Sequence, residues 1–503
     1  MTRAALLLLG TLQITVAAAG PAARIRAFLD ASPVARTAFW GVQIVDLDQH
    51  RVVFDLNPNR LFLPASNAKL FSTAMALMRL GPDYRFQTRV LADRAPDQAG
   101  CVAWLRIVGG GDPNLSGRGI PYRQGTAPVA DPLQAVEDLA GQVFARGVRC
   151  VDGDVVGDDT AYVWEPYPDG WSMDDGVWDY GAAVSALSVN DSTLTVTVLP
   201  GEHAEDAARI LLTPPLDYYE IDNRARTVRG VERKIVVDRL PGSRQLRIWG
   251  TLPPNDPGDI ETLGIDDPAL YAAYALRDRL ARHGIAIRGE ARARHLFPNQ
   301  VADLETGPAP EPEAGVELAR RDSAPLLEDL RITAKVSQNL HAEMALRAVA
   351  KARRQIGSRR AGLAEMRIFL EEAGIARSRY TFADGSGLSR LDLVSPSAVA
   401  GLLAYLYRSA VRDQWLSLLP VSGQDGTLHA RFAGTQAYPR QNRLALARQF
   451  AGRLRTARQW PDAGVLDTGK QLQWIACRSD RSHRSRLRAD GGIARDSPLL
   501  SVS

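Results

Sequence analysis

The order of hydrophobic and polar residues divides the chain into a helical part, a strand-rich part and a second helical part. Apolar residues at every third or fourth position predict helices, and short β-branched or aromatic runs between turn signals predict strands. The predicted helices are 24–29, 133–145, 270–283, 325–336, 341–352, 361–373 and 396–409. The predicted strands are 39–47, 52–55, 86–92, 102–108, 151–156, 194–198, 210–212, 234–238 and 245–250.

These elements predict an α+β protein in which a β-rich segment interrupts a helical unit. The pattern changes near residue 85 and again near residue 320. We expect a discontinuous catalytic domain of residues 24–84 and 320–437, split by an inserted β-rich region of residues 85–319. Long insertions are tolerated because closing a longer loop costs little additional free energy per residue.

Residues 1–19 have the layout of a secretory signal peptide. Arg3 precedes an apolar run that ends in three alanines at 17–19. The run is too short for an ordinary membrane span, although an uncleaved anchor is the alternative. The later sequence holds no apolar segment long enough to cross a bilayer, so we expect an exported protein with no membrane span in its mature form.

The three cysteines are Cys101, Cys150 and Cys477. In an exported protein Cys101 and Cys150 can pair, since each lies in or beside a predicted strand. Two unpaired, partly buried thiols are an equally open alternative. The cysteines do not have the spacing of a zinc site, and the sequence predicts no metal or other cofactor.

The strongest chemical signal is Ser66-Asn67-Ala68-Lys69, at the start of a helix that Gly81-Pro82 would stop. Ser66 and Lys69 then lie on the same side of that helix, one turn apart. A hydroxyl is a weak nucleophile until a base takes its proton, and a buried lysine can be that base if burial keeps it partly neutral. Ser-x-x-Lys is one known form of such a pair. Taken alone, Ser66 has helix capping as a competing interpretation.

A second signal is Ser337-Gln338-Asn339, between two predicted helices. A hydroxyl there can relay a proton, and an amide can hold the base or the peptide group of a substrate. Ser-x-Asn is common, and helix capping explains it by itself. Its weight therefore comes from the Ser-x-x-Lys pair about 270 residues earlier.

With these two signals and the further motifs given below, the chain resembles the penicillin-binding proteins. The nearest group is the low-molecular-mass D-alanyl-D-alanine carboxypeptidases/endopeptidases with a large insertion after the nucleophile helix. The resemblance covers nearly all of residues 24–440. Besides the two signals it rests on 109–115 (GGGDPNL), 153–159 (GDVVGDD), 180–190 (YGAAVSALSVN), 384–390 (DGSGLSR) and the stretch LPVSGQDGTL that ends at Leu428.

The resemblance implies a transpeptidase-like domain, an antiparallel sheet flanked by helices and split by the β-rich insertion. It implies a periplasmic serine-type D-Ala-D-Ala carboxypeptidase, which in some members also acts as a D,D-endopeptidase. The expected partners are peptidoglycan stem peptides, with β-lactams as covalent inhibitors.

The resemblance also implies a role for each motif residue. Ser66 would attack the penultimate D-Ala carbonyl and form an acyl-enzyme, and Lys69 would accept the Ser66 proton. Ser337 would pass that proton to the leaving D-Ala amine, and Asn339 would orient Lys69 and the substrate. Arg390, in the DGSGLSR turn, is placed to reach an acidic stem-peptide side chain, with a structural ion pair as the alternative.

The chain departs from the family pattern after Asp425-Gly426-Thr427, where a Lys-Thr-Gly strand should follow within about a dozen residues. Residues 438–445 read YPRQNRLA instead. Codons can be chosen for 439–445 that, read one nucleotide later, encode Arg-Ala-Lys-Thr-Gly-Ser-Leu. Our hypothesis is a frameshift, in the gene or in its recorded sequence, that makes 438–503 an out-of-frame tail.

The charge distribution fits this hypothesis. Residues 441–503 hold twelve Lys or Arg, five Asp and no Glu, a local charge of +7 that leaves −3 for the first 440 residues out of a total of +4. A basic tail can indicate nucleic-acid binding, but out-of-frame translation explains it without such a partner, and we expect none.

The frameshift also bears on activity. The family's strand lysine attracts the substrate carboxylate, and the strand backbone completes the oxyanion hole, so the chain as written is expected to be impaired. The alternative function is a non-catalytic peptidoglycan-binding or scaffold protein that retains the fold.

Overall fold

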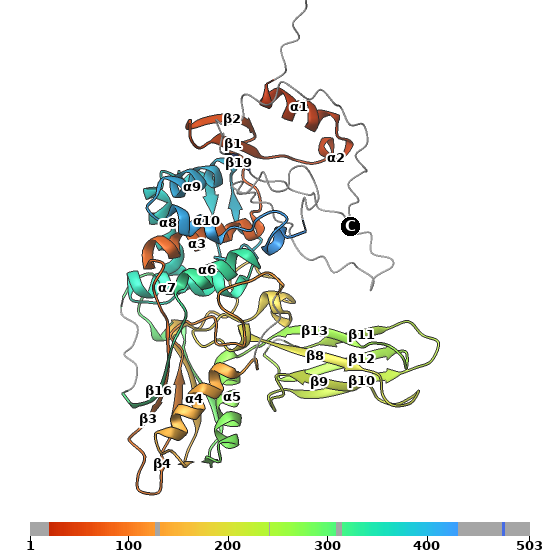
Figure 1. The fold of residues 1–503 in the computed structure, drawn as a ribbon, viewed down its shortest axis with the longest axis vertical. Coiled ribbons are helices and arrows are strands. Elements are labelled where there is room, and N and C mark those ends of the chain that lie inside the picture. The colour runs from red at the N-terminus through yellow and green to blue at the C-terminus, as the bar shows by residue number, and fades with distance from the viewer. Residues whose placement is uncertain (1–19, 126–130, 241, 308–313, 431–474, 478–503) are drawn as a thin grey trace, which may run out of the picture.

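A computed structural model describes residues 20–125, 131–240, 242–307, 314–430 and 475–477. The predicted signal peptide lies outside the described residues, as does the predicted out-of-frame tail apart from 475–477. Helices and both parallel and antiparallel strand pairs are present, which confirms the expected α+β class (Figure 1).

The helices of the expected catalytic domain pack around α3 (Ala68–Leu80), whose Phe71 and Met75 are fully buried. Five further helices complete this group: α6 (Leu326–Lys335), α7 (Asn339–Arg354), α8 (Arg359–Glu372), α9 (Pro396–Arg408) and α10 (Arg412–Leu418). Gly81 ends α3 with a φ of 83°, which glycine adopts without strain, as the Gly-Pro signal predicts. Because the buried side chains of α3 anchor it in the core, the turn that precedes this helix also has a fixed position.

The N-terminal elements form a small layer, and helix α9 packs against strand β1 of this layer. α1 (Pro21–Ala31) and α2 (Pro33–Arg36) lead into the hairpin of β1 (Val42–Asp46) and β2 (Arg51–Leu56), whose strands are antiparallel as predicted. β19 (Ile475–Cys477) lies parallel to β1. Figure 1 shows this layer at the top of the molecule, above α9.

The inserted region is built on a five-stranded mixed sheet. In spatial order its strands are β15 (Ala291–Leu296), β7 (Val155–Val163), β5 (Leu105–Val108), β3 (Gln87–Ala92) and β16 (Val316–Asp322). α4 (Gln134–Ala145) and α5 (Pro268–Arg282) pack against it. The expected domain boundary between 319 and 320 falls inside β16, because this strand stays paired with β3 as far as Asp322.

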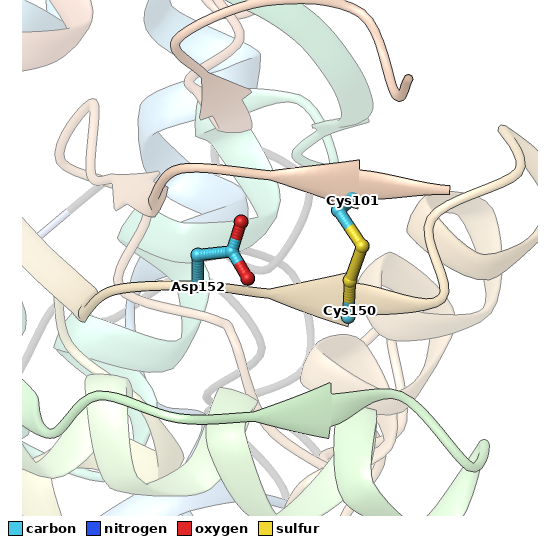
Figure 2. A group of neighbouring side chains, drawn as sticks. All are labelled: Cys101, Cys150 and Asp152. Carbon is cyan, nitrogen blue, oxygen red and sulfur yellow. A yellow bond between two sulfur atoms is a disulfide. The ribbon is translucent and has the colours of Figure 1, made fainter. Parts of the chain in front are cut away.

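A disulfide joins Cys101 to Cys150, which decides between the two alternatives that the sequence left open (Figure 2). The cysteines face each other on β4 (Cys101–Val102) and β6 (Cys150–Val151), and β14 (Ala286–Ile287) is the third strand of this small parallel sheet. Asp152 lies beside them. Both sulfurs are committed to each other, so this group offers no thiolate to a metal ion.

Two three-stranded sheets form an arm that projects to the side of the molecule in Figure 1. One holds β13 (Asp259–Gly264), β8 (Thr193–Leu199) and β9 (Arg209–Thr213), and the other holds β10 (Glu220–Thr227), β12 (Gln245–Leu252) and β11 (Lys234–Asp238). Alternate residues such as Val196, Val198 and Ile248 are fully buried in the same core. Buried residues thus recur at every second position along the strands of the arm, as expected for sheets with one buried face.

The structure differs from the sequence prediction mainly at sheet edges. The predicted strand 102–108 is two strands, β4 and β5, because the Asp93 carboxylate binds the Ala103 amide (2.8 Å) and interrupts the pairing. The missed strands of six or more residues are β10, β13, β15 and β16, and each lies at the edge of its sheet. Edge strands carry many charged residues, which hides them from a search for apolar runs. Among the described helices, none combines the length and apolarity that crossing a bilayer requires.

Candidate active site

Ser66 lies in a single 3₁₀ turn, Ala65–Asn67, that runs directly into α3. Asn67 occupies the cap position of α3, so Ser66 is not the helix cap. Ala65 has a φ of 47°, a left-handed conformation that is strained for alanine. Gly387 packs against this turn so closely that a Cβ there would lie 1.8 Å from the Ala65 carbonyl oxygen. The backbone before Ser66 is therefore held in an unusual conformation by a distant loop.

Lys69 follows one turn later and is only 3% exposed. Its Nζ lies 2.9 Å from Ser66 Oγ, 2.5 Å from Asn339 Oδ1 and 2.7 Å from the Ser386 carbonyl oxygen. An ammonium group has three N–H donors, and each is directed at one acceptor. The structure thus brings Ser66, Lys69 and Asn339 together, although Asn339 is 270 positions from Lys69 in sequence.

Asn339 is the first residue of α7, and its amide has a fixed orientation. Asn339 Nδ2 donates to the Tyr180 carbonyl oxygen at 2.7 Å. A carbonyl only accepts, so the other end of the amide, Oδ1, must face Lys69. Tyr180 opens the YGAAVSALSVN stretch, which gives this stretch of the sequence a contact with the site.

The residues 337–339 form the turn between α6 and α7, called here the Ser337–Asn339 corner. Ser337 is half-buried and has a φ of 64°, again left-handed. Gln338 caps α7, accepting a hydrogen bond from the Leu340 amide with its side-chain oxygen at 3.3 Å. The corner changes the chain direction within three residues and presents Asn339 to α3. Ser337 lies in this corner, two positions before Asn339.

Burial lowers the pKa of Lys69 to about 8, and nearby buried carboxyl groups, chiefly Asp384 and Glu343, oppose this effect. Glu343 is fully buried on α7, four residues after Asn339, and it accepts hydrogen bonds from the Gly385 amide (2.8 Å) and the Arg347 guanidinium (3.0 Å). A lysine with a pKa near 8 is partly neutral at physiological pH and is able to accept a proton.

The loop 384–392 supplies the Ser386 carbonyl and is organised by Asp384. This carboxylate accepts hydrogen bonds from the Gly387 amide (2.7 Å), the Ser389 amide (2.8 Å) and the Trp171 indole (2.8 Å). Asp392 lies beside it, and burial together with the Asp384 charge raises the pKa of Asp392 to about 10. The pKa of Asp384 is lowered by its hydrogen bonds, so the pair shares one proton, which Asp392 holds.

Arg390 ends the same DGSGLSR stretch and is exposed. Its amide donates to the Gly170 carbonyl oxygen at 3.2 Å, so the backbone of Arg390 is fixed to segment 169–175. Its guanidinium lowers the pKa of Asp175 in this segment, although burial dominates and raises that pKa overall. Arg390 thus lies in the loop that binds Lys69, on its solvent side.

Residues 22–444 match the D-Ala-D-Ala carboxypeptidase 3 (S13) family. The chain belongs to this family. The match covers well over half of the chain and includes every residue discussed above. The S13 assignment confirms the resemblance that the motifs indicated.

Individual relatives agree with the S13 assignment. The chain is 33% identical over 458 residues to a D-alanyl-D-alanine carboxypeptidase of Actinomadura sp. (strain R39), covering 86% of this chain and 80% of that protein. It is 22% identical over 408 residues to D-alanyl-D-alanine carboxypeptidase DacB of Haemophilus influenzae, covering 77% and 74%. The crystal structure of penicillin-binding protein 4 (dacB) from Haemophilus influenzae superposes with a TM-score of 0.64 at 23% identity, covering 78% of this chain and 80% of that one. The S13 fold is therefore shared.

Several groups that complete this S13 site escaped the sequence prediction. They are the Tyr180 and Ser386 carbonyls and the carboxyl groups of Glu343, Asp384 and Asp392. The carbonyls have no sequence signal, since any residue supplies one. Glu343 had a signal, because it lies one helical turn after Asn339 and on the same face of α7. Asp384 stands in a stretch that was recognised but received no role.

Proposed function

We propose that this chain is a serine-type D-Ala-D-Ala carboxypeptidase of peptidoglycan that is acylated on Ser66. Membership of the S13 family supports this proposal. The Actinomadura relative supports it as well, since that protein is named a D-alanyl-D-alanine carboxypeptidase. The observation that carries the proposal is the 2.9 Å contact between Lys69 Nζ and Ser66 Oγ, with two further acceptors fixed on the same amine.

The two fixed acceptors explain how Lys69 would work as a base. A neutral amine has two N–H donors and one lone pair. Asn339 Oδ1 and the Ser386 carbonyl bind both donors, which directs the lone pair at the Ser66 hydroxyl. Lys69 would then take the Ser66 proton as Oγ attacks the penultimate D-Ala carbonyl carbon.

The remaining steps assign roles to the Ser337–Asn339 corner. As the peptide C–N bond breaks, Ser337 would deliver a proton to the leaving D-Ala amine, while Asn339 holds Lys69 in place. Water would then hydrolyse the Ser66 ester and release the shortened stem peptide. The Ser66 amide would form half of the oxyanion hole. Arg390 is proposed as a contact for an acidic stem-peptide side chain because it is exposed on the loop that binds Lys69.

Export to the periplasm, removal of residues 1–19 and D,D-endopeptidase activity belong to the same proposal. An exported enzyme meets its peptidoglycan substrate directly, and the disulfide fits an oxidising compartment. Mass spectrometry of the mature N-terminus in the producing cell tests the export step, with a start near residue 20 as the expected result.

Labelling with a fluorescent penicillin tests the central proposal. The full chain should form a covalent adduct on Ser66, located by peptide mass spectrometry, and Ser66→Ala and Lys69→Ala should abolish it. Ser397→Ala, a serine at the start of α9, is the matched control and should label like the unmodified chain. Peptidoglycan binding without any adduct would instead support the alternative of a non-catalytic scaffold protein.

The frameshift hypothesis is tested beside it with a frame-corrected version that carries Arg-Ala-Lys-Thr-Gly-Ser-Leu after residue 438. Loss of one oxyanion donor costs roughly 10²–10³ in rate, so the corrected version should acylate faster by about that factor. Equal rates for the two versions would refute the claim that the chain as written is impaired.

A further inference from the structure

A fully buried histidine lies directly behind the Ser337–Asn339 corner. His341 is on α7, two residues after Asn339, and its side chain is 0% exposed. Its Nδ1 lies 2.7 Å from Asp329 Oδ1 on α6, and its Nε2 lies 3.1 Å from Asp191 Oδ1 in the turn before β8. One imidazole thus joins a helix of the catalytic group to a turn of the inserted region.

Both partners of His341 are carboxylates, and this determines its charge. An ionised carboxylate only accepts, and a neutral imidazole has only one N–H to donate. The Nε2 contact is a hydrogen bond, whereas the Nδ1 contact is a short ion-pair contact without hydrogen-bond geometry. A bare ring nitrogen 2.7 Å from a carboxylate oxygen would be repelled, so both contacts are favourable only if the ring carries two protons and a positive charge. Burial alone would lower the pKa of His341, but Asp329 and Asp191 raise it to about 9.

The charges that surround the imidazole come from several elements. Asp329 faces it from α6 and Asp191 from the turn 190–192. Asp112, in the GGGDPNL stretch, is close enough for His341 to affect its pKa, which burial raises to about 6. Arg118 pairs with Asp191, and Arg321 on β16 faces Asp112. His341 is the cation between Asp191 and Asp329.

Asp191 connects this histidine to the corner. Its second oxygen, Oδ2, accepts a hydrogen bond from Gln338 Nε2 at 3.2 Å and pairs with Arg118. Residues 190–192 all have left-handed φ values, 52°, 56° and 51°, as does Ser337 in the corner. A left-handed conformation is uncommon outside glycine and persists where the surroundings impose it. Two strained turns are thus joined through Asp191.

We propose that His341 is a positioning residue for the acylation of Ser66. As a buried cation it ties Asp191 to Asp329, and through Gln338 it holds Ser337 and Asn339 in register with Lys69. The inference rests on the proposed function. The partners of His341 are Asp191 and Asp329 rather than Ser66 or Lys69, so its effect is on the geometry of the corner.

The test replaces the charge while keeping the size of the side chain. The amide in His341→Gln can donate to one carboxylate but turns its oxygen toward the other. A misplacement of about 1 Å costs about 10²-fold in rate. The rate constant for penicillin acylation of Ser66 in His341→Gln should therefore fall about 10²-fold.

A rescue variant separates positioning from packing. In His341→Gln/Asp329→Asn the new amides complement each other, since the asparagine donates to the glutamine oxygen and the glutamine donates to Asp191. This double variant should recover most of the acylation rate. Its rate should also lack any decline that begins near pH 9 in the unmodified chain, where His341 loses its proton.

A second histidine provides the matched control. His295 on β15 likewise bridges two carboxylates, with Nδ1 2.9 Å from Asp159 Oδ1 and Nε2 3.3 Å from Asp267 Oδ2. His295→Gln should lower the unfolding temperature but leave the acylation rate unchanged. An unchanged rate in His341→Gln, or an equal loss in His295→Gln, would overturn the proposal.

The charge of His341 can also be measured directly, by a method that does not depend on enzyme activity. Nitrogen-15 NMR of histidine-labelled full chain, assigned with His341→Gln or with the double variant, reports whether both ring nitrogens of His341 are protonated at pH 7. A neutral ring would overturn the proposal even if His341→Gln fails to fold. If the unmodified chain gives no Ser66 adduct, the proposed function fails, whereas a charged ring still shows that His341 is a buried cation between Asp191 and Asp329.

Discussion

At the residue scale, the site depends on how one lysine is kept partly neutral without losing its place. Burial lowers the pKa of Lys69, and the carboxyl groups around it limit that shift. Asn339 and the Ser386 carbonyl hold the amine without adding charge. Neutral acceptors are suited to this role because a carboxylate in direct contact would stabilise the ammonium form.

A charge introduced at Asn339 tests this balance. Acylation of Ser66 requires neutral Lys69, so its rate should rise about tenfold per pH unit below about 8 and level off there, before the decline near pH 9 where His341 loses its proton. Asn339→Asp puts a carboxylate against Nζ, which should move the midpoint of the pH–acylation profile upward by about 1–3 units. The measurement is the penicillin acylation rate as a function of pH.

Asn339→Ala is the control for this prediction. It removes both hydrogen bonds of the amide but adds no charge, so the rate should fall without an upward shift of the midpoint. A midpoint that stays in place in Asn339→Asp would mean that another group controls the profile.

At the element scale, the loop 384–392 behaves as a unit that is built around one shared proton. Asp384 collects backbone and side-chain donors, Asp392 binds the Ala383 amide at 2.6 Å, and Ser72 of α3 donates to the Gly385 carbonyl at 2.7 Å. The loop therefore carries the Ser386 carbonyl to Lys69 as part of a rigid assembly. Glycine at 387 lets it approach the Ser66 turn.

The two aspartates of this loop should respond differently to the same substitution. Asp392→Asn imitates the protonated state that Asp392 already has, so it should change the free energy of unfolding by less than about 1 kcal/mol. Asp384→Asn removes the charge that several donors bind, and it should cost about 3 kcal/mol or more. Denaturant unfolding of the matched pair measures both values, and equal losses would refute the shared proton.

At the scale of the whole molecule, two cores are joined where the inserted region meets the helices around α3. Strand β7 belongs to the inserted sheet, yet its Tyr162 is buried in the helical core and donates to the Met344 carbonyl at 3.3 Å. Asp191 and Tyr180 also reach the Ser337–Asn339 corner from the insertion. The inserted region therefore forms its own sheet and also holds the Ser337–Asn339 corner in place.

The disulfide offers a test at this scale, because it lies in the inserted region. Cys101 and Cys150 are 49 residues apart, and closing a loop of that length stabilises the folded state by about 4 kcal/mol. Cys101→Ser/Cys150→Ser should therefore lower the free energy of unfolding by about that amount. Acylation of the folded variant should persist, since the disulfide contacts no residue proposed for the chemistry; its loss would show that the small parallel sheet supports the site directly.

The sequence by itself determined the longer helices, the central strands, the α+β class and the chemical motifs. These follow from local information, because helical periodicity, turn residues and a lysine three positions after a serine are all read within a few residues. It indicated Ser66, Lys69 and Asn339, which the structure brings together. It missed the four long edge strands β10, β13, β15 and β16, whose polar composition resembles that of loops.

Only the tertiary structure decided which groups surround Lys69 and which cysteines pair. The Ser386 and Tyr180 carbonyls and the His341 bridge join segments that are far apart along the chain, and the shared proton of Asp384 and Asp392 depends on the burial of their loop. A pKa depends on burial and on charges within a few ångströms, and neither quantity exists until the chain has folded. For this reason a sequence can name a base, but its fold sets the pH at which that base works.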